Sequence, residues 1–214
     1  CMAIATDANG GSGSISTSVT IENSAPTFTS EAEISGSSMT TGSTLTCAAV
    51  AEDINDGALT VYYEWNNGSG DILGSSSTLV IDASNTDVGG GISCTASVTD
   101  THGASASSTS SSVMVENTAP EIGSVEVTPI TPNSQETLTC TASDVVDGDD
   151  EEVSLSYTWT IDGVPQAETS NMLSGPFSVE SNVACHVTPN DGNIDGETVM
   201  ASVMIINTDP TADS

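Results

Sequence analysis

The sequence contains no lysine and no arginine against 30 aspartate and glutamate residues, so its formal charge at neutral pH is −30. Nucleic-acid-binding surfaces use lysine and arginine to neutralise phosphates, and so do segments that bind anionic lipid headgroups. Their absence argues against nucleic acid and against an anionic membrane surface as partners. Charge of one sign on this scale also opposes compaction through self-repulsion, unless cations bind or accumulate.

Aromatic residues make up only 3% of the chain, and strong charge with few aromatics is a signature of disorder. Against disorder, hydrophobic residues make up 36% and recur in alternating runs. No apolar run is long enough to span a bilayer and no signal-peptide pattern stands at the start, so we expect no membrane insertion. Five cysteines in a lysine-free chain rich in serine, threonine and glycine predict an oxidising location, extracellular or at the cell surface.

What the sequence does contain is an internal repeat. Three similar passages begin with a cysteine and end in a proline: CMAIATDANGGSGSISTSVTIENSAP from Cys1, CTASVTDTHGASASSTSSSVMVENTAP from Cys94 and CHVTPNDGNIDGETVMASVMIINTDP from Cys185. A second cysteine and a tryptophan recur upstream, as Cys47 with Trp65 and as Cys140 with Trp159. The cysteine offsets are 93, 93 and 91 residues (1 to 94, 47 to 140, 94 to 185), so the period is about 92 residues.

Within a repeat, the periodicity is that of β-strands. Runs such as TLTCAAV, LTVYYEW and ISCTASV alternate apolar residues with small or polar ones, and clusters of Gly, Asn, Asp and Ser separate them. No segment has the pattern of an amphipathic helix. Short strands in units of about 92 residues predict tandem Greek-key β-sandwiches.

The order cysteine, tryptophan, cysteine resembles that of immunoglobulin-like domains, and the segments ATDANG and VTDTHG resemble bacterial PKD-type and cadherin-like modules. In immunoglobulin-like domains the cysteines of strands B and F bridge the two sheets, and the tryptophan of strand C packs on the bridge. The resemblance therefore implies two disulfides, Cys47–Cys94 and Cys140–Cys185. Each would close a loop of about 48 residues and stabilise the fold by roughly 4 kcal/mol in the chain-entropy model. Buried free thiols are the alternative.

The repeat also predicts the domain organisation. Residues 25–117 and 118–207 form two complete immunoglobulin-like repeats, residues 1–24 contain strands F and G of a partial repeat, and residues 208–214 are the start of a further repeat or a tail. Cys1 aligns with the strand F cysteines, and the sequence holds no strand B partner for it. Either the sequence is a window on a longer array or a neighbouring copy supplies the missing strands. Lipidation of Cys1 is a third interpretation.

Acidic clusters fall at one end of each predicted sandwich, because the B–C loop, the F–G loop and the segment that leads into strand A meet there in an immunoglobulin-like fold. At the first complete repeat the candidate metal ligands are Glu22, Asn23, Asp53, Asn55, Asp56 and Asp100. At the second they are Glu116, Asn117, Asp144, Asp147, Asp149, Asp191 and Asn193. Asp150, Glu151 and Glu152 are interpreted as solvated charge.

Oxygen ligands from several segments favour calcium, which takes six to eight oxygens in flexible geometry, over magnesium, which requires a tight octahedron. The linkers ENSAP and ENTAP resemble those of cadherin-like repeats, and the resemblance implies that calcium stiffens the joints. The alternative is that these acids are solvated loop residues that keep the protein soluble.

Other chemistry has little support in the sequence. No G-x-S-x-G motif and no phosphate-binding glycine loop occurs, and the acid clusters recur in each repeat without aromatics to line a sugar cleft, so we expect no enzyme. His102 lies in an F–G loop where the other copies carry Asn9 or Gly192, and with the cysteines in disulfides no zinc site of the usual spacing is predicted. The tripeptide Asn67-Gly68-Ser69 makes Asn67 a candidate N-glycosylation site.

The sequence thus predicts an extracellular structural protein, a stalk or a fibre subunit, that associates end to end with copies of itself or with adjacent repeats. The alternative is an adhesin that recognises a glycan or a surface protein through its loops. The fold by itself does not choose between them.

Overall fold

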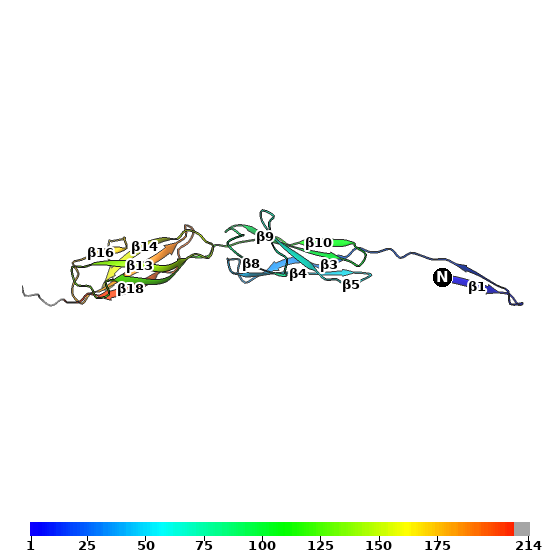
Figure 1. The fold of residues 1–214 in the computed structure, drawn as a ribbon, viewed down its shortest axis with the longest axis horizontal. Helices are drawn as coiled ribbons and strands as arrows, with labels where there is room; N and C mark the ends of the chain where they lie inside the picture. The colour runs from blue at the N-terminus through cyan, green and yellow to red at the C-terminus, as the bar shows by residue number, and fades with distance from the viewer. Residues whose placement is uncertain (208–214) are drawn as a thin grey trace, which may run out of the picture.

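The structure is a computed structural model that describes residues 1–207; the prediction for residues 208–214 lies outside this range. The described residues contain β-strands and turns and no helix, hence none that is long and apolar enough to cross a bilayer. Figure 1 shows three parts in a row: an N-terminal hairpin, a first sandwich and a second sandwich.

The hairpin consists of β1 (Met2–Thr6) and β2 (Ser12–Ser16), which pair antiparallel with Met2 opposite Ser16. Every residue of both strands is exposed, including Ile4 and Ile15, and Cys1 is an exposed free thiol. The hairpin, for which the repeat predicts strands F and G, therefore has none of the burial that these strands have in the two sandwiches.

The first sandwich pairs two antiparallel sheets. One contains β3 (Thr27–Ser35), β4 (Thr44–Asp53), β5 (Gly57–Ala58) and β8 (Thr78–Val80), and β4 pairs with the other three. The other has the order β10 (Ser105–Thr109), β9 (Gly91–Thr99), β6 (Tyr62–Asn67) and β7 (Ile72–Gly74), and β11 (Val113–Met114) also pairs with β9. In immunoglobulin terms, β4, β6 and β9 are strands B, C and F.

The second sandwich repeats this plan. One sheet has the order β12 (Glu121–Thr128), β13 (Thr137–Val146) and β16 (Met172–Ser174). The other has the order β15 (Val164–Pro165), β14 (Ser154–Ile161), β17 (Asn182–Asn190) and β18 (Val199–Met204). Here β13, β14 and β17 are strands B, C and F.

Each sandwich has its own core around a disulfide and a tryptophan. Cys47 is bonded to Cys94 and Cys140 to Cys185. Trp65 and Trp159 are fully buried, each opposite the strand F cysteine of its sandwich, and each indole N–H donates to a backbone carbonyl, at 2.8 and 2.9 Å. The tandem immunoglobulin-like fold with B–F disulfides is therefore confirmed, whereas the exact domain boundaries stay predictions.

Candidate metal centres at the sandwich ends

Strand alternation carries an aspartate to the inner side at the end of strand F in both sandwiches. Along β9 the inward residues include Cys94, Ala96 and Val98, and the same phase continues to Asp100, which is only 6% exposed. Asp191 holds the same position after β17 and is 9% exposed. A side chain that follows an inward-facing row leaves the strand pointing toward the interior, so both carboxylates are buried at the sandwich end.

Strand B brings a second aspartate to the same end. Asp53, the last residue of β4, continues the inward row of Leu45, Cys47 and Ala51 and is 4% exposed. Asp147 follows β13 and is half-buried. Because the disulfide joins strands B and F, each sandwich holds these two aspartates at one end.

At the first junction the linker is tied to both loops. The side-chain amide of Asn23 donates to Asp100 Oδ2 at 2.8 Å, and the backbone N–H of Ser24 donates to Asn55 Oδ1 at 3.0 Å. Asp100 Oδ1 also accepts the backbone N–H groups of His102 and Ala104, at 2.8 and 2.9 Å. The Asn23 amide is the main cause that holds the pKa of Asp100 below its usual value, since it stabilises the charged form.

The second junction repeats these contacts. Asn117 donates to Asp191 Oδ2 at 2.8 Å, and the Thr118 N–H donates to Asp149 Oδ2 at 2.6 Å. Asp191 Oδ1 accepts the N–H groups of Asn193 and Ile194, at 2.6 and 2.7 Å. The Asn117 amide is the main cause that lowers the pKa of Asp191. Both linkers are thus held by the same pair of interactions.

One carboxylate oxygen of each strand B aspartate has no hydrogen-bond partner. Asp53 Oδ1 accepts the N–H groups of Asn55 and Asp56, at 2.6 and 3.0 Å, and Asp147 Oδ1 accepts that of Asp149 at 2.8 Å. Oδ2 of Asp53 and Oδ2 of Asp147 are buried and have no partner anywhere in residues 1–207. A buried carboxylate oxygen without a partner is costly, and a bound cation would supply that partner. The donor set therefore fits a divalent cation at each junction.

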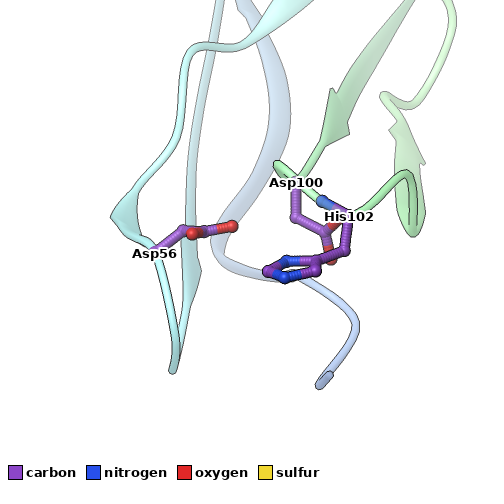
Figure 2. A group of neighbouring side chains, drawn as sticks. All are labelled: Asp56, Asp100 and His102. Atoms are coloured by element: carbon purple, nitrogen blue, oxygen red, sulfur yellow. Dashed lines mark hydrogen bonds between the residues drawn. The ribbon is translucent and has the colours of Figure 1, made fainter. Parts of the chain in front are cut away.

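The two junctions share a frame made of the linker asparagine, the strand F aspartate and the strand B aspartate, and they differ in the residues around it. At the first, Asp56 Oδ2 accepts the backbone N–H of Thr101 at 3.0 Å. One ligand atom each of Asp56, Asp100 and His102 lies within 4.8 Å of the other two. Figure 2 shows Asp56 reaching across from the B–C loop toward Asp100 and the His102 ring on the F–G loop. At the second, the Asn193 amide donates to Glu151 at 3.1 Å.

The second junction also connects two complete sandwiches directly. The hydroxyl of Thr41, in the turn of the first sandwich that precedes β4, donates to Asp149 Oδ1 in the B–C loop of the second. Asp149 thus bonds to the preceding sandwich through Thr41 and to the linker through Thr118. Figure 1 shows the two sandwiches meeting end to end at this point.

Three of the residues expected as ligands are not joined to these networks. Glu22 and Glu116 are exposed, and their carboxylates make no hydrogen bond within the described residues. Asp144 is exposed within β13 opposite Gly123, and its φ of 54° shifts the inward row by one residue, so that Val145 and Asp147 follow it. Asp144 therefore lies outside the hydrogen-bond networks, and its role as a ligand stays a prediction.

Sequence reasoning missed four participants: His102, Thr101, Glu151 and Thr41. The hydrogen bonds pair His102 with Asn193, since each is two residues past its aspartate and donates its N–H to that aspartate. The counterpart of His102 is therefore Asn193 and not Gly192. An alignment anchored on the strand F aspartates finds this match, and it also identifies Asp7, whose Oδ1 accepts the N–H groups of Asn9 and Gly11.

Asn67 is the last residue of β6, directly before a turn, and its side chain is engaged. Its Oδ1 accepts the N–H groups of Ser69 and Asp71, and its Nδ2 donates to Asp71 Oδ2 at 3.2 Å and to the Asn85 carbonyl at 3.4 Å. Attachment of a glycan to Nδ2 would require these donor bonds to break. Glycosylation at this position stays a prediction.

Comparisons with known proteins find distant structural similarity. No protein-family model and no curated protein matches the sequence. The three N-terminal domains of the highly immunogenic outer capsid protein of bacteriophage RB49 are 16% identical over 84% of this chain and 59% of that one, with a TM-score of 0.33. A calcium-stabilised adhesin that helps an Antarctic bacterium bind ice is 16% identical over 99% of this chain and 57% of that one, with a TM-score of 0.34. The FN1–FN3 domains of chicken CNTN1 are 13% identical over 85% of this chain and 68% of that one, with a TM-score of 0.33. The chain spans less than two thirds of the first two, and the similarities are too distant to assign a function.

Proposed function

We propose that this chain is an extracellular structural segment, part of a stalk or a fibre, whose sandwiches are joined end to end through calcium ions at their junctions. The observation that carries the proposal is the pair of buried carboxylate oxygens without partners, Asp53 Oδ2 and Asp147 Oδ2, at equivalent positions of the two sandwiches. One such oxygen could be accidental. Its recurrence beside the same asparagine–aspartate pair favours a built site in each repeat.

Calcium is the ion that best fits the second junction. Two hydrogen-bonded groups from three segments lie there, Asn117 with Asp191 and Thr118 with Asp149 and Asp147, and their ligand atoms are carboxylate and amide oxygens. This hard, all-oxygen set suits the six to eight ligands and flexible geometry of calcium. An ion shared by the linker and both loops would restrain the hinge between the sandwiches, since without it the carboxylates repel one another.

An extracellular location is supported by the two disulfides, which persist in oxidising environments. The proposed partners are adjacent repeats or further copies of the chain, in line with the row in Figure 1. The PKD-type or cadherin-like assignment remains a resemblance. An adhesin role has less support, because Tyr62 is the only large aromatic side chain among the described residues that is strongly exposed, at 66%.

The experiment that tests this proposal measures shape and stability together. Small-angle scattering and thermal unfolding are recorded on the full chain in a chelator and in excess calcium. Calcium is expected to raise the midpoint and to lengthen the molecule by straightening the second junction; at 100 times its Kd it adds about 2.7 kcal/mol to the stability. An unchanged midpoint and an unchanged scattering profile would overturn the proposal.

A further inference from the structure

The first junction contains an element that the second lacks, an imidazole placed between carboxylates. Asp56 comes from the B–C loop, Asp100 and His102 from the F–G loop, and one ligand atom of each lies within 4.8 Å of the other two. Figure 2 shows the three side chains converging from the two loops. In the second junction the position of His102 is taken by Asn193, which offers an amide instead.

Hydrogen bonds determine which nitrogen of His102 is available. The hydroxyl of Thr101 lies 3.0 Å from both oxygens of Asp56 and 3.2 Å from Nδ1 of His102. A hydroxyl has one hydrogen and a carboxylate only accepts, so the Thr101 hydrogen goes to Asp56. Nδ1 of His102 must then be the donor toward Thr101, which leaves the lone pair on Nε2. Metal-binding histidines are commonly fixed in this way, with the other ring N–H held by a neighbouring acceptor.

The carboxylates keep coordination sites free. Asp100 accepts two N–H groups on Oδ1 but only the Asn23 amide on Oδ2. Asp56 receives the Thr101 N–H on Oδ2 and shares the Thr101 hydroxyl between its two oxygens. Since a carboxylate offers about four lone-pair sites, each retains capacity for a cation.

An independent observation lies in the same turn. Asp53 is 4% exposed, its Oδ1 accepts the N–H of Asp56, and its Oδ2 is buried without a partner. The turn that presents Asp56 is therefore built on a buried carboxylate with an unmet need for positive charge. This need exists at both junctions, but only the first adds a nitrogen ligand.

We propose that the first junction binds a transition-metal ion, with Zn²⁺ as the test ion, through Asp56, Asp100 and Nε2 of His102. Imidazole suits zinc, copper and nickel, whereas calcium and magnesium take oxygen ligands. Two carboxylates and one histidine are ordinary zinc ligands, and water fills the remaining position. The inference deepens the proposed function, on which it rests for the idea of a cation at each junction, and it makes the two junctions respond to different metals.

The test titrates Zn²⁺ alone into the full chain by calorimetry, in a Cys1→Ser background because the exposed Cys1 thiol could also bind zinc. His102→Asn, which copies the second junction, is expected to weaken zinc binding at least about tenfold, and Thr101→Val, which removes the acceptor for Nδ1, by about 10- to 100-fold. His186→Asn, in β17 of the second sandwich, is the matched control and should bind zinc like the parent. Equal zinc affinity in His102→Asn and the parent would overturn the assignment.

A second readout does not depend on the folding of any variant. The ¹⁵N chemical shifts of the His102 ring in the parent protein should show Nε2, and not Nδ1, responding to zinc, and zinc-independent shifts would overturn the proposal. Calcium-induced stabilisation of the second sandwich, followed in the same proteins, should be unchanged in His102→Asn. If calcium does not stabilise the parent but zinc still binds to it, the proposed function alone is rejected. If calcium stabilises the parent but zinc does not bind, the zinc site alone is rejected.

Discussion

The two junctions share one frame and differ in what surrounds it. In both, a linker asparagine bonds to the aspartate that ends strand F, and a strand B aspartate keeps one buried oxygen without a partner. The second junction adds a contact between complete sandwiches, from Thr41 to Asp149, and the first adds His102. The comparison indicates that the frame belongs to the repeat, since it follows from strand register, and that the loop residues give each junction its own chemistry.

The largest effect is expected from removing the disulfide that joins the two aspartate-bearing strands of a sandwich. In Cys140→Ala/Cys185→Ala the second sandwich loses the covalent link between the two aspartate-bearing strands, at a cost of about 2–5 kcal/mol. Hydrogen exchange read by mass spectrometry should show faster opening of β13 and β17, with β4 and β9 unchanged. The matched pair Cys47→Ala/Cys94→Ala should give the mirror pattern. Equal loss of protection in both sandwiches from either pair would show that they do not fold as separate units.

The next effect isolates the buried oxygen at each junction. Asp147→Asn removes the charge that a calcium ion would neutralise, so the second sandwich should lose its calcium-dependent stability, about 2.7 kcal/mol at 100 times the Kd. In chelator the same variant should be no less stable than the parent, because the substitution also removes a negative charge whose Oδ2 is buried without a partner. Thermal unfolding at matched calcium concentrations measures both.

Two control variants test whether the loss of calcium-dependent stability is specific to Asp147. Glu126→Gln removes the same charge from an exposed position of β12 and should keep the full calcium effect. Asp53→Asn changes the first junction only and should also keep the calcium effect on the second sandwich. If Asp147→Asn retains the whole calcium increment, Asp147 is not a ligand.

These predictions also show how much the sequence could tell. Alternation and repetition predicted the strands and the two repeated sandwiches, whereas the disulfides and the buried tryptophans were implied by the resemblance to immunoglobulin-like domains. Asp53 and Asp100 were predicted as ligands because the B–C and F–G loops meet at one end of an immunoglobulin-like fold; in the structure each continues the inward row of its strand. Asp144 was expected among the ligands as well, and its role stays a prediction; its left-handed backbone shifts the inward row, and nothing in the run DVVDGDD indicates which residue takes that conformation.

His102 and Thr41 were missed for a different reason. The partners of His102 come from two loops, and rules on zinc spacing look for ligands close together in sequence. Thr41 bonds to Asp149 across the junction, and a contact between two domains depends on their relative placement, which no repeat pattern encodes. The meeting of the linker with the B–C and F–G loops was therefore accessible from the sequence, whereas the individual side-chain contacts of His102 and Thr41 were not.

A smaller effect is expected from the linker amides and acts through pH. The pKa of Asp191 is lowered in the folded protein chiefly by Asn117, so its contribution to stability is present above the unfolded pKa of about 3.9 and is lost as the pH falls through the lower folded value. In Asn117→Ala the folded pKa should rise, so unfolding in chelator begins at a higher pH, and the lost hydrogen bond should cost about 1 kcal/mol at neutral pH. Asn23→Ala should do the same through Asp100. Acid titrations monitored by hydrogen exchange of each sandwich would contradict this interpretation if the onset of unfolding stayed fixed.

The smallest effect tests the direct contact between the two sandwiches at the second junction. Thr41→Val keeps the shape of the side chain and removes the hydroxyl that bonds to Asp149. Because Thr41 belongs to the core of neither sandwich, the stability of each should change by less than about 1 kcal/mol, the scale of one net hydrogen bond. The angle between the sandwiches should nevertheless become more variable in chelator, which residual dipolar couplings measure, and calcium should restore it through Asp149. A joint that is equally rigid in Thr41→Val and in the parent without calcium would mean that the linker, through Asn117 and Thr118, sets the geometry of the second junction without help from Thr41.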